Sequence, residues 1–231
     1  MIELKHELPR VTHGTCGDET YGGNQLLFAN LTMQRCGCGL VGALDVLLYL
    51  HRYHGFTIEF LKDIPEGLLT KEQYEHCAEQ LKKHGIPLVY PLGTTGLNLS
   101  AGLNHQFRKN RIPLRAHWYV PTVRLWGEIE RMLEQDIPVV MSAGDHFPDF
   151  WKKDGLRLYL SREPGSACVE AVSHYFTVTG IDEEWLCVSS WGTKYWVRKQ
   201  EFESFVKKST PLFSNILKIE RKENGTEDPE V

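Results

Sequence analysis

One stretch constrains this chain more than any other: a glycine-bracketed cysteine that leads directly into a long apolar helix. Gly37, Cys38 and Gly39 are followed, up to Leu50, by leucines that recur at helical spacing. The spacing predicts a helix that is buried along one face, with the thiol of Cys38 at its N-terminus. Unpaired backbone N–H groups and the helix dipole favour an anion there, so this cysteine need not be protonated at neutral pH.

Composition and charge narrow the class of protein. The chain has 231 residues, of which 42% are hydrophobic and 24% charged, as in globular domains that bury a substantial core. A net charge of −4 gives no basic field for nucleic acid, and no apolar run approaches the ~18 residues that span a bilayer. The N-terminus lacks the apolar core of a signal peptide, and the six cysteines are scattered. We therefore expect a cytoplasmic protein with a small or peptidic partner and no nucleic-acid or membrane partner.

The hydrophobic pattern predicts an α+β fold. Residues 1–20 are predicted to form an irregular arm and residues 222–231 a disordered tail, on either side of a single domain at 21–221. After the Cys38 helix, further helices are predicted at 70–84, 99–109, 122–136 and 201–208, and strands at 114–120, 137–142, 173–180, 185–190, 194–198 and 216–219. The loop from 144 to 165 carries exposed-looking aromatic residues at Phe147, Phe150 and Trp151 and could line or cover a cleft.

A nucleophilic cysteine needs a base and a group that orients the base. His174 lies at the start of the strand predicted at 173–180, and the strand at 185–190 should pair with it. This pairing would bring Ser189 or Ser190 close to the imidazole. The chain order is then a cysteine on a helix, a histidine on a strand and a polar residue on the adjacent strand.

This order resembles that of the papain-like cysteine peptidases. The run from His174 to Gly180 is similar to their histidine strand, and Ser189-Ser-Trp-Gly192 is similar to their Asn-Ser-Trp-Gly motif. Residues 128–142 resemble the segment that precedes the histidine in double-glycine-leader (bacteriocin-processing) peptidases. Tyr21-Gly-Gly-Asn-Gln25, taken with the glycine-bracketed cysteine, looks like peptidase-like proteins of clostridia.

The resemblance implies a papain-like fold with a helical N-terminal part, whose central helix carries the cysteine, and an antiparallel C-terminal sheet. Position by position, it implies Cys38 as the nucleophile, His174 as general base and acid, Ser189 as the orienting residue and Gln25 as the oxyanion donor. The family has Asn or Asp where this chain has a serine, and its oxyanion glutamine lies six positions before the cysteine. The open alternatives are therefore Cys36 for Cys38, Asn30 or Gln34 for Gln25, and Ser190 for Ser189.

The expected function is that of a cysteine peptidase, or of a related thiol acyl hydrolase or transferase, acting on a peptide or amide bond of a peptide or protein substrate, with no cofactor or metal. Two other classes compete with it. A catalytically silent relative would bind peptide in the same cleft, since a serine hydroxyl has no charge with which to stabilise an imidazolium. Cys36-Gly-Cys38 could also bind a metal, although the paired Cys-x2-Cys pattern of structural zinc sites is absent.

Overall fold

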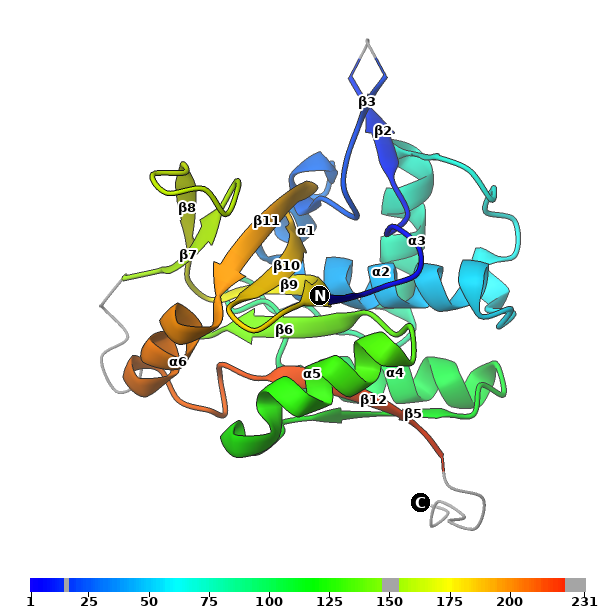
Figure 1. The fold of residues 1–231 in the computed structure, drawn as a ribbon. Coiled ribbons are helices and arrows are strands. Elements are labelled where there is room, and N and C mark those ends of the chain that lie inside the picture. Colours follow the sequence, from blue (N-terminus) through cyan, green and yellow to red (C-terminus); the bar gives the residue numbers. More distant parts are fainter. Residues whose placement is uncertain (15–16, 147–153, 223–231) are drawn as a thin grey trace.

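The structure, a computed structural model, describes residues 1–14, 17–146 and 154–222 (Figure 1). Its helices are α1 (Leu31–Cys36), α2 (Cys38–Tyr53), α3 (Lys71–Lys83), α4 (Gly96–Lys109), α5 (Leu125–Glu134) and α6 (Lys199–Lys208), with 3₁₀ turns η1 (Gln25–Leu27), η2 (Glu59–Leu61) and η3 (Thr122–Arg124). Its strands are β1 (Ile2–Glu3), β2 (Val11–His13), β3 (Asp18–Glu19), β4 (Leu69–Thr70), β5 (Leu114–Trp118), β6 (Val139–Ala143), β7 (Leu156–Tyr159), β8 (Cys168–Ala171), β9 (His174–Ile181), β10 (Trp185–Ser190), β11 (Thr193–Arg198) and β12 (Ile216–Arg221). The α+β class expected from the sequence is therefore confirmed.

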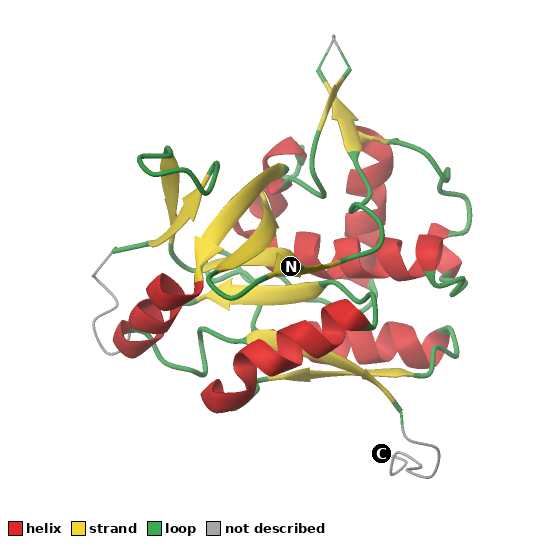
Figure 2. Cartoon of the chain, viewed as in Figure 1, coloured by secondary structure: helices red, strands yellow, loops and turns green. Residues whose placement is uncertain are grey.

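A large antiparallel sheet dominates the fold (Figure 2). Within the described residues it has nine strands, in the order β5-β12-β6-β9-β10-β11-β7-β8, with β1 paired to the end of β9. The central strands β6, β9 and β10 are buried along nearly their whole length, whereas β5 and β11 alternate between buried and exposed positions. Burial of both sides of a strand requires cover on both faces of the sheet, which the helices provide.

Helix α2 packs directly on the sheet and brings its first turn to the start of β9. It contacts β6, β9 and α4, while α5 contacts β6, β9 and β12 and lies in front of the sheet in Figure 1. Gly42 allows the close approach, because a Cβ atom there would lie 3.0 Å from Val140 of β6. One turn earlier, a Cβ atom on Gly39 would lie 3.1 Å from the ring of Tyr175. The N-terminus of α2 is therefore fixed beside His174.

The short helix α1 and the long helix α2 meet at Gly37. This residue ends α1 and begins α2, and it makes no side-chain cap because it has no side chain. A Cβ atom at this position would lie 2.2 Å from the carbonyl oxygen of Met33, so only glycine fits the junction. The first backbone N–H groups of α2 are thus left without a capping side chain, and the thiol of Cys38 lies among them.

The N-terminal residues, expected to form an irregular arm, are part of the fold. β1 pairs with β9, and β2 lies between β3 and β4 in a small second sheet. Leu8 and Val11 are fully buried. These strands have only two or three residues each, too few to show a two-residue hydrophobic period. The predicted tail lies outside the described residues apart from Lys222, as do the aromatic positions 147, 150 and 151.

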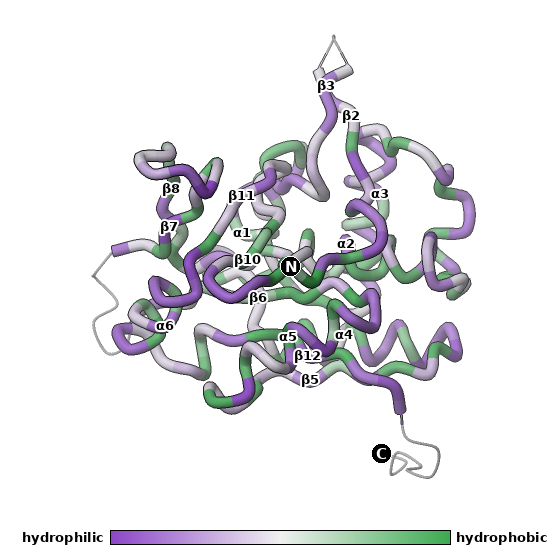
Figure 3. Tube along the Cα trace, in the orientation of Figure 1, coloured by the Kyte–Doolittle hydropathy of each residue, from purple (hydrophilic) through white to green (hydrophobic). Residues whose placement is uncertain are grey.

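One hydrophobic cluster extends through the chain, from Val11 to Ile219. Figure 3 shows that β6, at its centre, is hydrophobic over most of its length. No helix in the described part of the chain is long and apolar enough to cross a membrane.

Candidate functional site

Cys38 and His174 line the same small cavity, where α2 meets the main sheet. Cys38 is the first residue of α2, and His174 is the first residue of β9. The cavity measures about 10 Å³, and Gln25, Ser189 and Ser190 also line it. The four residues expected from the sequence, together with the alternative serine, therefore surround one space that has room for about one water molecule.

The imidazole of His174 is fixed on two sides by the end of β10. Its Nε2 atom lies 2.7 Å from the hydroxyl oxygen of Ser190, and its ring stacks on the indole of Trp191 with the ring centroids 4.1 Å apart. Only 5% of His174 is exposed, and burial lowers the pKa of its imidazole to about 3. The ring is therefore neutral at pH 7, and Nδ1 is the nitrogen that Ser190 leaves unoccupied.

Trp191 reaches the imidazole from a tight turn. Trp191 and Gly192 connect β10 to β11 and have φ angles of 48° and 72°, the combination that a type I′ hairpin turn requires. A residue with a side chain loses roughly 1–2 kcal/mol in this left-handed conformation. An aromatic stack contributes about 0.5–1.5 kcal/mol, so contact with His174 offsets much of that cost. The turn thereby holds the indole over the imidazole.

Cys38 is a thiol in this arrangement, not a thiolate. Although the residue is partly exposed, burial of its surroundings raises the pKa of Cys38 above the ordinary value. Backbone N–H groups of Tyr175, Gly39 and Cys38 itself lower the pKa, but by less than burial raises it. The helix N-terminus, which could have lowered the pKa of this thiol, does not do so here, because loss of water outweighs the favourable N–H groups.

The partner of His174 is Ser190 and not Ser189, which the resemblance had favoured. The Ser189 hydroxyl donates instead to the carbonyl oxygen of Tyr21, at 2.5 Å. Successive side chains of a strand point to opposite faces, so only one of the two serines can reach the imidazole. A register shift between β9 and β10 decides which one does, and no short motif records such a shift.

Of the two glutamines considered as oxyanion donors, Gln25 lines the cavity and Gln34 does not. The Gln25 Nε2 atom donates to the Gln34 carbonyl oxygen at 3.0 Å. The Gln34 side chain donates back to the carbonyl oxygens of Leu26 and Phe28, at 3.2 and 3.3 Å. Gln34 therefore shapes the η1 turn, while the second N–H of the Gln25 amide is left for another acceptor.

Asn30 and Cys36, the alternative pair for the oxyanion donor and the nucleophile, make their hydrogen bonds within the short helix α1. The Asn30 side chain caps α1 by accepting from the backbone N–H groups of Thr32 and Met33, both at 3.1 Å. Cys36 is buried, and its thiol donates to the carbonyl oxygen of Thr32 at 2.9 Å. Neither residue is among those that line the cavity within the described chain.

Sequence reasoning missed Asp45, a buried acid on α2 that belongs to the same neighbourhood. Its carboxylate accepts hydrogen bonds from the backbone N–H of Gly23 and from the hydroxyl of Tyr74. The sequence did contain a signal for it, because a charged residue within the apolar run of α2 indicates a buried acid, and a buried acid usually has a polar partner. Asp45 connects α2 to the segment that carries Gln25.

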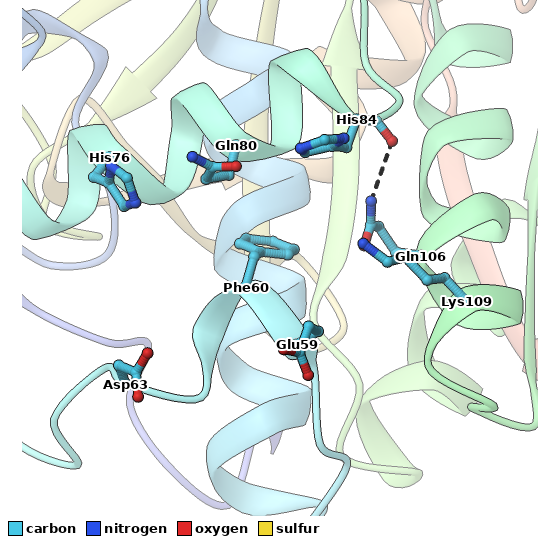
Figure 4. A pocket seen from close by; sticks show the side chains of 8 residues that line it. All are labelled: Glu59, Phe60, Asp63, His76, Gln80, His84, Gln106 and Lys109. Atoms are coloured by element: carbon cyan, nitrogen blue, oxygen red, sulfur yellow. Dashed lines mark hydrogen bonds between the residues drawn. The ribbon is translucent and has the colours of Figure 1, made fainter.

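A larger groove lies elsewhere, between α3, η2 and α4 (Figure 4). It measures about 310 Å³ and is lined by polar side chains that include His76 of α3 and His84, the residue directly after that helix. It contains no cysteine or serine among its lining residues. Throughout the described residues, no three His, Cys, Asp or Glu side chains are grouped so as to hold a metal ion, in this groove or around Cys36 and Cys38.

Comparisons with protein-family models, with curated proteins and with solved structures find no match to this chain.

Proposed function

We propose that this chain is a papain-like cysteine peptidase, or a related thiol acyl hydrolase or transferase, acting on a peptide or amide bond. One observation carries the proposal: Cys38, at the N-terminus of the helix on the sheet, and His174, at the start of the central strand, line one cavity. The bond from His174 Nε2 to Ser190 supports it, since an oriented base is what a nucleophilic thiol needs.

In the proposed reaction the neutral pair acts by general-base catalysis. Ser190 accepts the Nε2 proton, so the lone pair of Nδ1 is free to take the proton of the Cys38 thiol. The sulfur attacks the carbonyl carbon, and the electrons of the C=O double bond move to the oxygen. His174 then gives the proton to the leaving amine as the C–N bond breaks. Water, or an acceptor amine in a transferase, attacks the resulting thioester and returns Cys38 to its thiol form.

The oxyanion is stabilised by two donors in this proposal. One is the backbone N–H of Cys38, which belongs to the uncapped first turn of α2. The other is the Nε2 group of Gln25, whose second N–H is not used by Gln34. Loss of one such donor typically lowers the rate about 10²–10³-fold.

A catalytically silent peptide-binding protein is the second candidate, and specific observations favour it. The cavity holds about one water molecule, and the pKa of His174 near 3 disfavours an imidazolium. A substrate carbonyl can enter only if cavity-lining side chains, such as Trp191, move outward. A silent protein would bind peptide at the same place without acylation of Cys38.

Acetylation by p-nitrophenyl acetate separates the two candidates, because this small activated ester reports thiol attack on a carbonyl. We expect Cys38 to acetylate at least about 100 times faster than the other cysteines, the contribution that a general base makes. Intact mass and peptide mapping follow the reaction in the wild type, in Cys38→Ala and in the matched control Cys36→Ala. Fast acetylation should vanish in Cys38→Ala and persist in Cys36→Ala. Equal, slow acetylation of all cysteines would overturn the enzymatic proposal and leave the binding protein.

A further inference from the structure

Asp45 is the buried acid nearest in the chain to the proposed nucleophile. It follows Cys38 by seven residues on α2, which is about two helical turns, so the two residues share a face of the helix. Asp45 is 1% exposed. The backbone N–H of Gly23 lies 3.1 and 3.0 Å from its two carboxylate oxygens, and the Tyr74 hydroxyl donates to it at 2.9 Å.

The segment that Asp45 holds is the one that leads into Gln25. Gly22 has a φ of +74°, and a Cβ atom there would lie 3.0 Å from the Asp45 carboxylate. A Cβ atom on Gly23 would lie 1.8 Å from the Tyr74 hydroxyl oxygen. Both positions therefore require glycine, and the backbone lies directly against the acid and the tyrosine.

The other side of the same segment is held by the hairpin of β10 and β11. Tyr21 donates its backbone N–H to the carbonyl oxygen of Gly192 at 2.7 Å, and its own carbonyl accepts from Ser189 at 2.5 Å. Residues 21–25 are thus clamped between α2 and α3 on one side and the strand that ends in Ser190 on the other. Asp45 and Tyr74 form the helical side of this clamp.

We propose that Asp45 is a positioning residue for the oxyanion site: through Gly23 it fixes the Gln25 amide relative to the N-terminus of α2. The inference rests on the proposed function, since it assigns Asp45 a place in that reaction. The nucleophile and Asp45 belong to one rigid helix, so the contact sets the distance between the two oxyanion donors. Burial raises the pKa of Asp45 to about 7, which shows that the acid costs stability where it lies. A role in positioning explains why an acid occupies this buried site, where its oxygens accept from the Gly23 N–H and the Tyr74 hydroxyl.

Two reagents test this role on Cys38. Acetylation by p-nitrophenyl acetate passes through an oxyanion, whereas alkylation by iodoacetamide is a displacement at carbon without one. In Asp45→Asn we expect the acetylation rate of Cys38 to fall at least tenfold and the alkylation rate to stay within twofold of the wild type. Gln25→Ala should show the same split. A merely structural role would change both rates together or neither.

The matched control is Asp136→Asn. Asp136 is also a buried acid that accepts from a backbone N–H, that of Lys5, and from a tyrosine hydroxyl, that of Tyr49, but it does not line the cavity. Both rates should be unchanged in this variant. Tyr74→Phe removes one contact of Asp45 and should show a smaller split, which keeps the test valid if Asp45→Asn does not fold.

The possible failures are distinguishable. If Cys38 is acetylated at the wild-type rate in Asp45→Asn but more slowly in Gln25→Ala, the role of Asp45 is overturned and the proposed function stands. Absence of selective Cys38 acetylation in the wild type would overturn the proposed function and this inference with it.

Discussion

The Nε2 atom of His174 and the hydroxyl oxygen of Ser190 lie 2.7 Å apart, across the paired strands β9 and β10. The contact fixes the ring and leaves Nδ1 as the ring nitrogen that does not bond to Ser190. A neutral hydroxyl stabilises an imidazolium less than a carboxylate does, which agrees with the low pKa of His174. Ser190 therefore orients the imidazole of His174 but does not stabilise a positive charge on it.

Removal of the Ser190 hydroxyl should slow Cys38, and removal of the Ser189 hydroxyl should not. A hydrogen bond contributes about 0.5–1.5 kcal/mol, so we expect Ser190→Ala to lower the iodoacetamide alkylation rate of Cys38 at pH 7 by up to about tenfold. Ser189→Ala breaks only the bond to the Tyr21 carbonyl and should stay within twofold of the wild type. Peptide mapping of the alkylated protein measures both rates. A larger loss in Ser189→Ala would mean that the wrong serine has been assigned.

A carboxylate in place of the Ser190 hydroxyl should activate the thiol at lower pH. An opposite charge at this distance shifts a pKa by about 1–3 units, so Ser190→Asp should raise the pKa of His174 and favour a thiolate–imidazolium pair. The alkylation rate of Cys38 at pH 6 should then exceed that of the wild type. Ser190→Asn is the uncharged control and should show no such gain. Equal pH profiles of the two variants would contradict an electrostatic origin of the effect.

Replacement of Trp191 should expose the imidazole without breaking the hairpin. Asn-Gly is the preferred pair of a type I′ turn, so Trp191→Asn suits the φ angles of this loop while it removes the indole from His174. Hydration should raise the pKa of His174 by about two units or more. Proton NMR of the imidazole measures this directly, and an unchanged titration in a folded variant would show that other side chains exclude the water.

Much of the fold was predictable because its signals are local. Thr70 caps α3 and Gln73 completes the capping box, so that helix begins where the sequence predicts. The strands β9, β10 and β11 also lie within a residue of their predicted bounds, because apolar and β-branched residues mark them. β1, β7 and β8 were missed: β1 has two residues and depends on β9, a partner distant in the chain, while β7 and β8 are short strands that pair with each other within a polar segment.

The candidate site was predictable in its parts but not in its details. Cys38, His174 and Gln25 were identified by residue type, flanking glycines and chain order, and the structure groups them around one cavity. The choice of Ser190 depends on a register shift, and the thiol form of Cys38 depends on water lost when the sheet covers it. Both effects depend on tertiary packing, so a local sequence pattern does not predict them.

The neutral His174 should make the fold less stable in acid. Its pKa is about 3 in the folded chain and 6.5 ordinarily, so the unfolded chain binds the additional proton between these values. The stability that this pKa difference contributes is fully present above pH 6.5. As the pH falls below 6.5, it is lost by about 1.4 kcal/mol per pH unit. Urea unfolding at several pH values should show that the wild type loses more stability than His174→Gln between pH 6.5 and 4.5. Parallel curves would mean that the folded imidazole titrates normally.

Asp45 should contribute a pH dependence of the opposite sign. Its pKa is raised to about 7 from 3.8, so the folded chain, not the unfolded one, binds the additional proton between these values. The contribution is fully present below pH 3.8 and is lost as pH rises through 7, again by about 1.4 kcal/mol per pH unit. Relative to the wild type, Asp45→Asn should therefore gain stability as pH rises from 5 to 7, whereas Asp136→Asn serves as a control for loss of a buried acid elsewhere. A gain of the same size in both variants would contradict a titration specific to Asp45. If instead the wild type became more stable than Asp45→Asn as pH rises, the hydrogen bonds from Gly23 and Tyr74 would be keeping the carboxylate ionised.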